Sequence, residues 1–229
     1  LGSRGLGDVY KRQGAFWCKG ISPNDFSTVY SADTIAAVKK LQSDAGITAN
    51  GTMTTNLMAA LFDMSAFVLV QNGDAKIRAM QQWLNANYES YIGIRPCDGI
   101  YQRDTNEALI YALQAIEGMS PSEANGYYGN QTIALTPTVK VGEHGNIVKL
   151  IQYGLYVNNY YQSGAFDGYF STTVANEIVA FRKFMILPDG SLSSASTYSG
   201  VADLRVIKGL LTSNGDTGRD SNTFDCATQ

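Results

Sequence analysis

The chain has 229 residues, of which 45% are hydrophobic and 16% charged, with a formal net charge of −3 at pH 7. This apolar content is typical of a folded globular chain and excludes a disordered one. Phosphate-backbone binding needs clustered Lys and Arg, and because no basic run is present we expect no nucleic-acid partner. No apolar run approaches the roughly 20 residues that cross a bilayer, so we expect no membrane span.

The number and spacing of the cysteines and histidines limit the metal and redox chemistry that is possible. Cys18, Cys97 and Cys226 lie far apart and form no Cys-x-x-Cys pair, and His144 is the only histidine. This spacing gives no zinc site, and we expect no metal and no cofactor. The odd number of cysteines argues against a disulfide framework, although a Cys18–Cys97 bridge stays open.

The first residues of the chain have a foreign character. Asp8 to Gln13 (Asp-Val-Tyr-Lys-Arg-Gln) resembles the in-frame translation of an adapter used to fragment DNA for sequencing. We therefore expect residues 1–13 to be an artefact and the natural protein to begin near Gly14.

Helix and turn signals then alternate along the rest of the chain. Residues 14–64 predict a helix that begins at Ser31 or Asp33, a turn at Asn50-Gly51 and a short closing helix. Residues 65–138 predict a helix over 74–87, with Asp74 as its N-cap, and another over 104–117. Residues 139–208 predict helices over 146–159 and 172–185, a turn at Asp189-Gly190 and a weak last helix.

Two of these segments share one order of residue types, about 70 positions apart. Asp98-Gly99 and Asp167-Gly168 each predict a turn, followed by two apolar or aromatic residues, a polar cap and a helix. The helix before each turn repeats one face, with Ile77, Met80, Gln81 and Leu84 in the first copy and Val148, Ile151, Gln152 and Leu155 in the second. A weaker copy upstream contains Thr34, Ala37, Val38, Leu41 and Gln42.

The period predicts three small helical modules, over 14–64, 65–138 and 139–208. It places the opening helix of the first module near residue 6, where no matching apolar stripe exists. We therefore expect that module to lack its first helix and to leave an apolar face uncovered.

This pattern resembles the peptidoglycan-binding domain family, whose small three-helix modules tether cell-wall hydrolases to the bacterial wall. The matching residues are Asp98, Gly99, Ile100, Tyr101, Thr105, Ala108 and Leu109, with the helix faces given above. The resemblance implies a mainly α fold of tandem three-helix modules. Residues 209–229 form a polar linker and a short strand that ends in Asp225. They are similar to the start of a lysozyme-like glycoside-hydrolase domain, which implies a truncated α/β barrel-like domain.

Tyrosines in or beside the turns are the candidate ligand-binding residues, because a Tyr ring covers a sugar face or a peptide stem while its hydroxyl stays solvated. They are Tyr101, Tyr127, Tyr128 and Tyr169. Arg103 can pair with a stem-peptide carboxylate through two hydrogen bonds. Asp225 is the candidate catalytic residue, since barrel enzymes carry such groups at strand ends. Its partners would follow residue 229, so we expect the fragment itself to be catalytically silent.

We therefore expect a monomeric, non-catalytic unit that binds peptidoglycan, through the glycan strand or the stem peptide, outside the cell or in the wall. It would tether an attached cell-wall hydrolase. One alternative is the N-terminal fragment of a lysozyme-like glycoside hydrolase in which the repeats are mainly structural. Another is a structural helical repeat that binds a protein, which predicts an exposed apolar groove instead of a Tyr-rich polar one.

Overall fold

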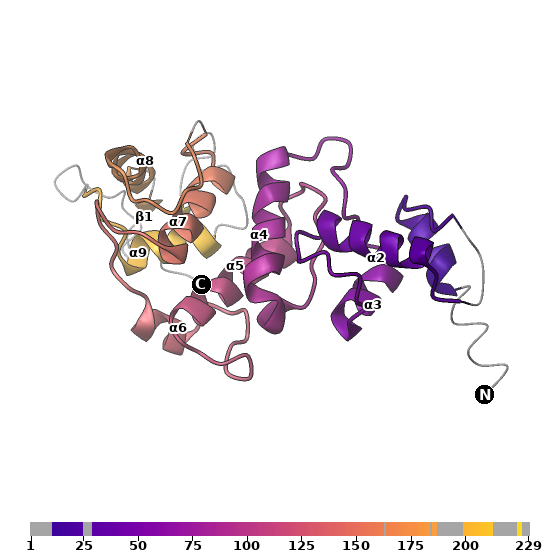
Figure 1. The fold of residues 1–229 in the computed structure, drawn as a ribbon. Helices are drawn as coiled ribbons and strands as arrows, with labels where there is room; N and C mark the ends of the chain where they lie inside the picture. Colours follow the sequence, from indigo (N-terminus) through magenta and orange to yellow (C-terminus); the bar gives the residue numbers. More distant parts are fainter. Residues whose placement is uncertain are drawn as a thin grey trace. The chain divides into compact units, whose positions relative to one another are not determined.

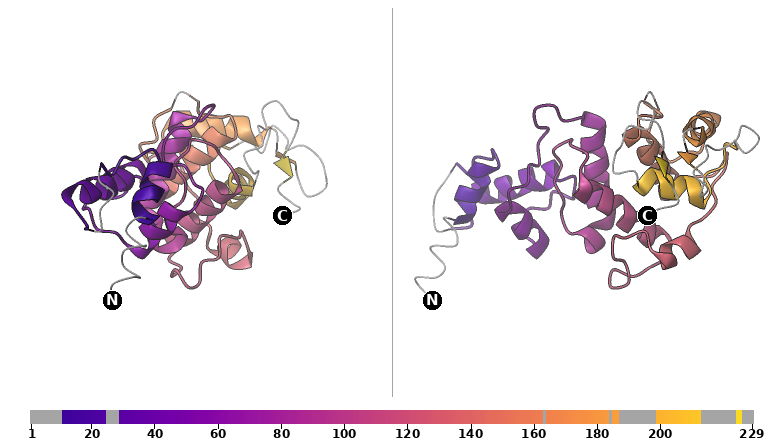
Figure 2. Two further views of the ribbon diagram at one scale, coloured as in Figure 1. Left: turned by 90° about the vertical axis from the view of Figure 1, so that its right-hand side faces the viewer. Right: turned by 180° about the vertical axis from the view of Figure 1, so that it is seen from behind.

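The computed structural model describes residues 11–24, 29–162, 164–183, 185–186, 199–212 and 224–225. These residues are mainly helical, which confirms the predicted mainly α class. The chain divides into two compact units, Leu1–Ile100 and Tyr101–Gln229 (Figures 1 and 2). The boundary falls inside the predicted module 65–138, so the two main helices of that module belong to different units.

The first unit contains α2 (Ala32–Asp44), α3 (Thr55–Phe62) and α4 (Ala75–Ile92), and residues 11–18 are also helical. Its core gathers apolar side chains from the first two helices and the segments around them, among them Phe16, Leu41, Leu57, Leu61 and Phe67. The expectation of a missing opening helix is wrong, because the helical residues 11–18 place Phe16 in this core. Gln13, fully buried three residues before Phe16, has the spacing of the Gln81–Leu84 pair.

Helix α4 belongs to the first unit because its side chains form hydrogen bonds with that unit, and this explains why the predicted module 65–138 is divided between the two units. The Asp74 carboxylate accepts hydrogen bonds from the backbone N–H groups of Lys76 and Ile77, which confirms the predicted N-cap. Asn85 Nδ2 donates to the Ala45 carbonyl at 3.0 Å, and Arg78 Nη2 to the Phe67 carbonyl at 2.9 Å. These bonds fasten α4 to the first unit.

Helix α4 also runs five residues past its predicted end at residue 87. Tyr88 has a non-helical backbone (φ −131°, ψ 20°), and the helix stops before Gly93, which has φ 68°. Tyr88 and Ile92 are both buried. Tertiary packing therefore holds a last turn that local propensity does not predict.

The second unit contains α5 (Arg103–Ile116), α6 (Asn130–Leu135), α7 (Asn146–Val157), α8 (Thr172–Arg182) and α9 (Leu204–Thr212). Helix α7 packs against α5, α8 and α9, and α5 also packs against α9 (Figure 1). Gly154 lets α9 approach α7, because a Cβ there would lie 3.1 Å from the Cβ of Leu210. Leu210 and Leu211 are buried, so the predicted boundary between residues 208 and 209 falls inside a helix.

Strand structure is minimal in the described residues. β1 (Met185–Ile186) pairs in parallel with β2 (Phe224–Asp225) in a two-stranded sheet. The described residues show no barrel, and most of the segment in which its start was predicted, residues 213–223 and 226–229, lies outside them. Helix α8 ends at Arg182, three residues before its predicted end. The Asp189-Gly190 turn and Cys226 lie outside the described residues. Within the described residues, Cys18 is exposed, Cys97 is buried and both are free thiols.

Among the helices described, none combines the length and the apolar character needed to cross a bilayer. Within the described part of the chain, no group of three or more His, Cys, Asp or Glu side chains is arranged so that it could hold a metal ion.

Four turns are each fastened to a helix by a buried glutamine, and we call them anchored turns. They are Asn50-Gly51, Asp98-Gly99, Asn125-Gly126 and Asp167-Gly168. In the last, Gln152 Nε2 donates to the Asp167 carboxylate at 2.8 Å and to the Tyr169 carbonyl at 3.2 Å. The N–H of Gly168 donates back to Gln152 Oε1 at 2.9 Å, and the N–H of Tyr169 to the Asp167 carboxylate at 2.9 Å.

The other three anchored turns repeat this pattern with Gln42, Gln81 and Gln114. All four glutamines are at most 2% exposed. Each glycine has φ between +67° and +81°, the left-handed region that glycine adopts without a Cβ clash. A buried amide that satisfies several turn groups at once explains why a polar residue recurs on otherwise apolar helix faces.

Candidate binding site

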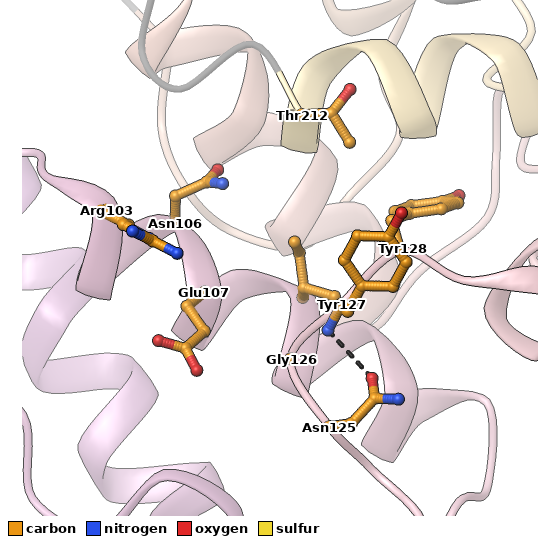
Figure 3. Close-up of a pocket in the computed structure, with 9 residues that line it drawn as sticks. Arg103, Asn106, Glu107, Asn125, Gly126, Tyr127, Tyr128 and Thr212 are labelled. Carbon is orange, nitrogen blue, oxygen red and sulfur yellow. Dashed lines mark hydrogen bonds between the residues drawn. The ribbon is translucent and has the colours of Figure 1, made fainter. Parts of the chain in front are cut away.

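A pocket of about 330 Å³ lies in the second unit beside the anchored turn Asn125-Gly126. Its lining comes from three places: α5, the turn and the last residue of α9 (Figure 3). The lining residues are Arg103, Asn106, Glu107, Ile110, Asn125, Gly126, Tyr127, Tyr128 and Thr212. The packing of α5 on α9 thus brings together residues that lie up to about a hundred positions apart in the sequence.

The turn side of the pocket is held by Gln114. Its Nε2 donates to Asn125 Oδ1 and to the Tyr127 carbonyl, each at 3.0 Å. The Tyr127 N–H donates to Asn125 Oδ1 at 3.0 Å, as the dashed line in Figure 3 marks. Gly126 is required because a Cβ there would lie 2.5 Å from the Tyr111 ring. These constraints give Tyr127 a fixed backbone at the rim of the pocket.

Three of the five predicted ligand-binding residues meet in this pocket. Arg103 is exposed on the first turn of α5, and Tyr127 is 66% exposed. Tyr128 is 3% exposed, so its ring forms part of the wall and has little surface to offer. The site therefore presents one guanidinium and one open aromatic ring.

A short hydrogen-bonded chain leads from the pocket wall into the protein. Tyr128 Oη lies 2.7 Å from Thr136 Oγ1, which lies 3.1 Å from Glu117 Oε1. Partial burial raises the pKa of Glu117 to about 7, and the hydrogen bond from Thr136 opposes that shift. Burial also raises the pKa of the Tyr128 hydroxyl, which stays protonated. The charge of Glu117 therefore changes near neutral pH, next to the wall of the pocket.

The remaining predicted residues lie elsewhere. Tyr101 does not line the pocket, but its hydroxyl donates to Asn106 Oδ1 at 2.7 Å, so it acts from behind a residue that does. Tyr169 belongs to the Asp167-Gly168 turn, where its ring lies 4.9 Å from the His144 ring. Asp225 lies in β2, and its predicted catalytic role stays a prediction.

The sequence patterns did not single out Asn106, Glu107, Asn125 or Thr212 as binding residues, although all four line the pocket. Asn106 and Glu107 lie three and four positions after Arg103, which places them on the same side of α5. That spacing was a usable signal. Thr212 had none, since only the packing of α9 brings it to the pocket.

The sequence of this chain matches a known protein family. Residues 70–204 match the FadG/YbfG, PGDB-like domain family, and the chain belongs to that family. It is 48% identical over 219 residues to the uncharacterized protein YbfG of Bacillus subtilis (strain 168), covering 94% of this chain and 29% of YbfG. It is 35% identical over 224 residues to the uncharacterized protein FadG of the same organism, covering 95% of this chain and 37% of FadG.

The chain thus spans well under half the length of these relatives. No solved structure matches it.

The predicted resemblance to three tandem peptidoglycan-binding domains followed by a lysozyme-like domain is wrong. One family match spans residues 70–204, across two of the three predicted modules, and no lysozyme-like domain is matched. The physical reason lies in the anchored turn. A glutamine bonded to an Asx-Gly turn stabilises a helical fold wherever it occurs, so its recurrence does not identify a family. The C-terminal tail is too short to specify a barrel.

Proposed function

We propose that this chain is a non-catalytic peptidoglycan-binding unit, and that the pocket beside Asn125-Gly126 holds part of the wall polymer. The observation that carries the proposal is the pocket itself, whose lining combines the exposed Tyr127 ring with the side-chain donors of Arg103 and Asn106. Ligand sites commonly combine an aromatic surface with a few polar groups that fix orientation. The name of the PGDB-like domain, which suggests peptidoglycan binding, supports the same function.

The lining of the pocket favours binding to a polar polymer over binding to an apolar protein surface. Ile110 is the one aliphatic side chain among the lining residues, whereas five are polar or charged and two are tyrosines, beside one glycine. A groove for an amphipathic helix would instead need a row of apolar side chains. The unit would act at the cell wall and hold the rest of a longer protein there. The attached hydrolase stays a prediction.

Co-sedimentation of the 229-residue chain with purified cell-wall sacculi tests the proposal. We expect the chain to pellet with sacculi and to stay in solution with cellulose, an insoluble glycan without peptide. Tyr127→Ala should weaken the binding to sacculi. Failure of the unaltered chain to pellet with sacculi, or equal retention on cellulose, would contradict the proposed function.

A further inference from the structure

Asn106 is a buried polar side chain that faces the pocket. The residue is 6% exposed and lines the cavity. Its Oδ1 accepts the hydrogen bond from the Tyr101 hydroxyl at 2.7 Å. Burial raises the pKa of Tyr101, so this phenol stays protonated and keeps a proton to donate. The carbonyl end of the Asn106 amide is therefore occupied, and its orientation is set by Tyr101.

The other end of the amide remains open to the pocket. No acceptor among the described residues pairs with Asn106 Nδ2, and this atom is not one of the fully buried atoms that lack a partner. It is thus a hydrogen-bond donor accessible from the cavity. With the Asn106 carbonyl bonded to Tyr101, the Nδ2 group is the end of the amide left for a bound group, which must bring an acceptor.

Arg103 supplies a positive charge on the same side. It precedes Asn106 by three positions on α5 and lines the same cavity. It forms no ion pair with any described residue. Glu107, the one carboxylate in the lining, already takes part in another interaction. A guanidinium and a fixed amide donor favour an anionic acceptor, since hydrogen bonds between ionised groups are about twice as strong as neutral ones.

We propose that this pocket binds a carboxylate on a short stem, with Arg103 and Asn106 donating to its oxygens and the Tyr127 ring covering the stem. Tyr101 is a positioning residue that fixes the donor face of Asn106. The inference rests on the proposed function and names the ligand chemistry of its site. Peptidoglycan carries such a carboxylate at the end of its stem peptide and, where the stem peptide has been removed, on the lactyl group of muramic acid.

Titration of the 229-residue chain, followed by NMR, compares acetyl-D-alanyl-D-alanine with its carboxamide and N-acetylmuramic acid with its methyl ester. We expect the acid form of one pair to bind at least about tenfold more tightly than its neutral form, and the pair that responds identifies the source. Equal binding within both pairs, or no binding in either, overturns the inference. If the chain still pellets with sacculi, the proposed function survives that result, whereas failure to pellet removes both.

Variants separate positioning from simple structural damage. Asn106→Asp should abolish the preference for the acid, because it replaces the donor with a negative charge. Tyr101→Phe should reduce the ratio of acid to carboxamide affinity several-fold and leave carboxamide binding unchanged. Arg103→Gln should weaken acid binding, and Lys140→Gln, which removes an exposed charge outside the pocket, should not. Parallel losses for both forms in Tyr101→Phe and Arg103→Gln would show that these residues only maintain the fold.

Discussion

The two Asn-Gly anchored turns share one scaffold and differ in what surrounds it. Asn50-Gly51 is held by Gln42, and Asn125-Gly126 by Gln114, with the same hydrogen bonds at 2.8–3.0 Å. The first glycine faces Ile35 and Lys39, whereas the second faces Glu107 and Tyr111. The helix positions that face the glycine are thus equivalent in the two turns, but the residues at these positions differ in chemistry.

The cavities beside these turns differ in the same way. The one beside Asn50 has a volume of about 210 Å³, and its lining contains no aromatic and no cationic residue. The residue after the glycine is Thr52 in the first turn and Tyr127 in the second. The hydrogen bonds of the turn use backbone atoms at that position, so its side chain is free to vary. An anchored turn therefore supplies rigidity, and the residues placed on it supply recognition.

The largest effect should come from removing the anchors. Gln42→Leu and Gln114→Leu each leave the turn donor and acceptors without their buried partner. We expect both to lower the free energy of unfolding by about 2–4 kcal/mol. Urea denaturation followed by circular dichroism measures this. A loss below about 0.5 kcal/mol in either variant would show that the shared scaffold is not what stabilises the turns.

The next largest effect should come from the two glycines, whose substitution should lower stability by different amounts in the two turns. Gly51→Ala places a Cβ at φ 79° and 2.9 Å from an Ile35 methyl group, and should cost about 1–2 kcal/mol. Gly126→Ala places it at φ 67° and 2.5 Å from the Tyr111 ring, so its cost should be larger by about 1 kcal/mol from overpacking. Thermal and urea unfolding compare them, and equal costs would mean that the Tyr111 ring moves aside freely.

Recognition should depend on the side chain after the glycine. Tyr127→Ala should weaken binding to sacculi about tenfold, since an exposed aromatic ring contributes on the order of 1 kcal/mol or more at a binding site. Thr52→Ala, the matched change at the other turn, should leave binding unchanged. Quantitative co-sedimentation over a range of sacculi concentrations gives both values. Equal losses in the two variants would place the binding site outside the pocket.

The smallest effect should be a pH dependence of stability that arises from Glu117, near the second turn. Because the folded pKa of Glu117 is raised from 4.5 to about 7, its contribution to stability is complete below pH 4.5 and is lost as the pH rises to about 7. Glu117→Gln keeps the neutral form at every pH. It should raise Tm slightly at pH 8 and leave Tm unchanged at pH 4, as scanning calorimetry would show. A higher Tm at both pH values would indicate better packing without a change in proton binding.

Much of the local structure was predictable because short-range chemistry determines it. The Asp74 cap, the glycines at positive φ and the glutamines that recur about 70 positions apart all depend on contacts within one helix and its adjoining turn. Arg103 and Tyr127 were predictable as ligand candidates for the same reason, since both stand beside such turns. The predicted family resemblance was wrong because it rested on the anchored turns, which determine local geometry but do not identify a family.

The amino-acid sequence by itself determined the helices, the turns and the residue types at the rim of the pocket, through hydrogen bonds and propensities that act over a few positions. Only the tertiary structure decided which helices share a unit. It assigned α4 to one unit and α5 to the other, brought Thr212 to Asn106, and directed a buried amide at the cavity. These outcomes depend on how apolar faces from distant segments pack together. Many arrangements of the helices would satisfy the local hydrogen bonds and propensities, and the fit of side chains between distant segments selects one of them.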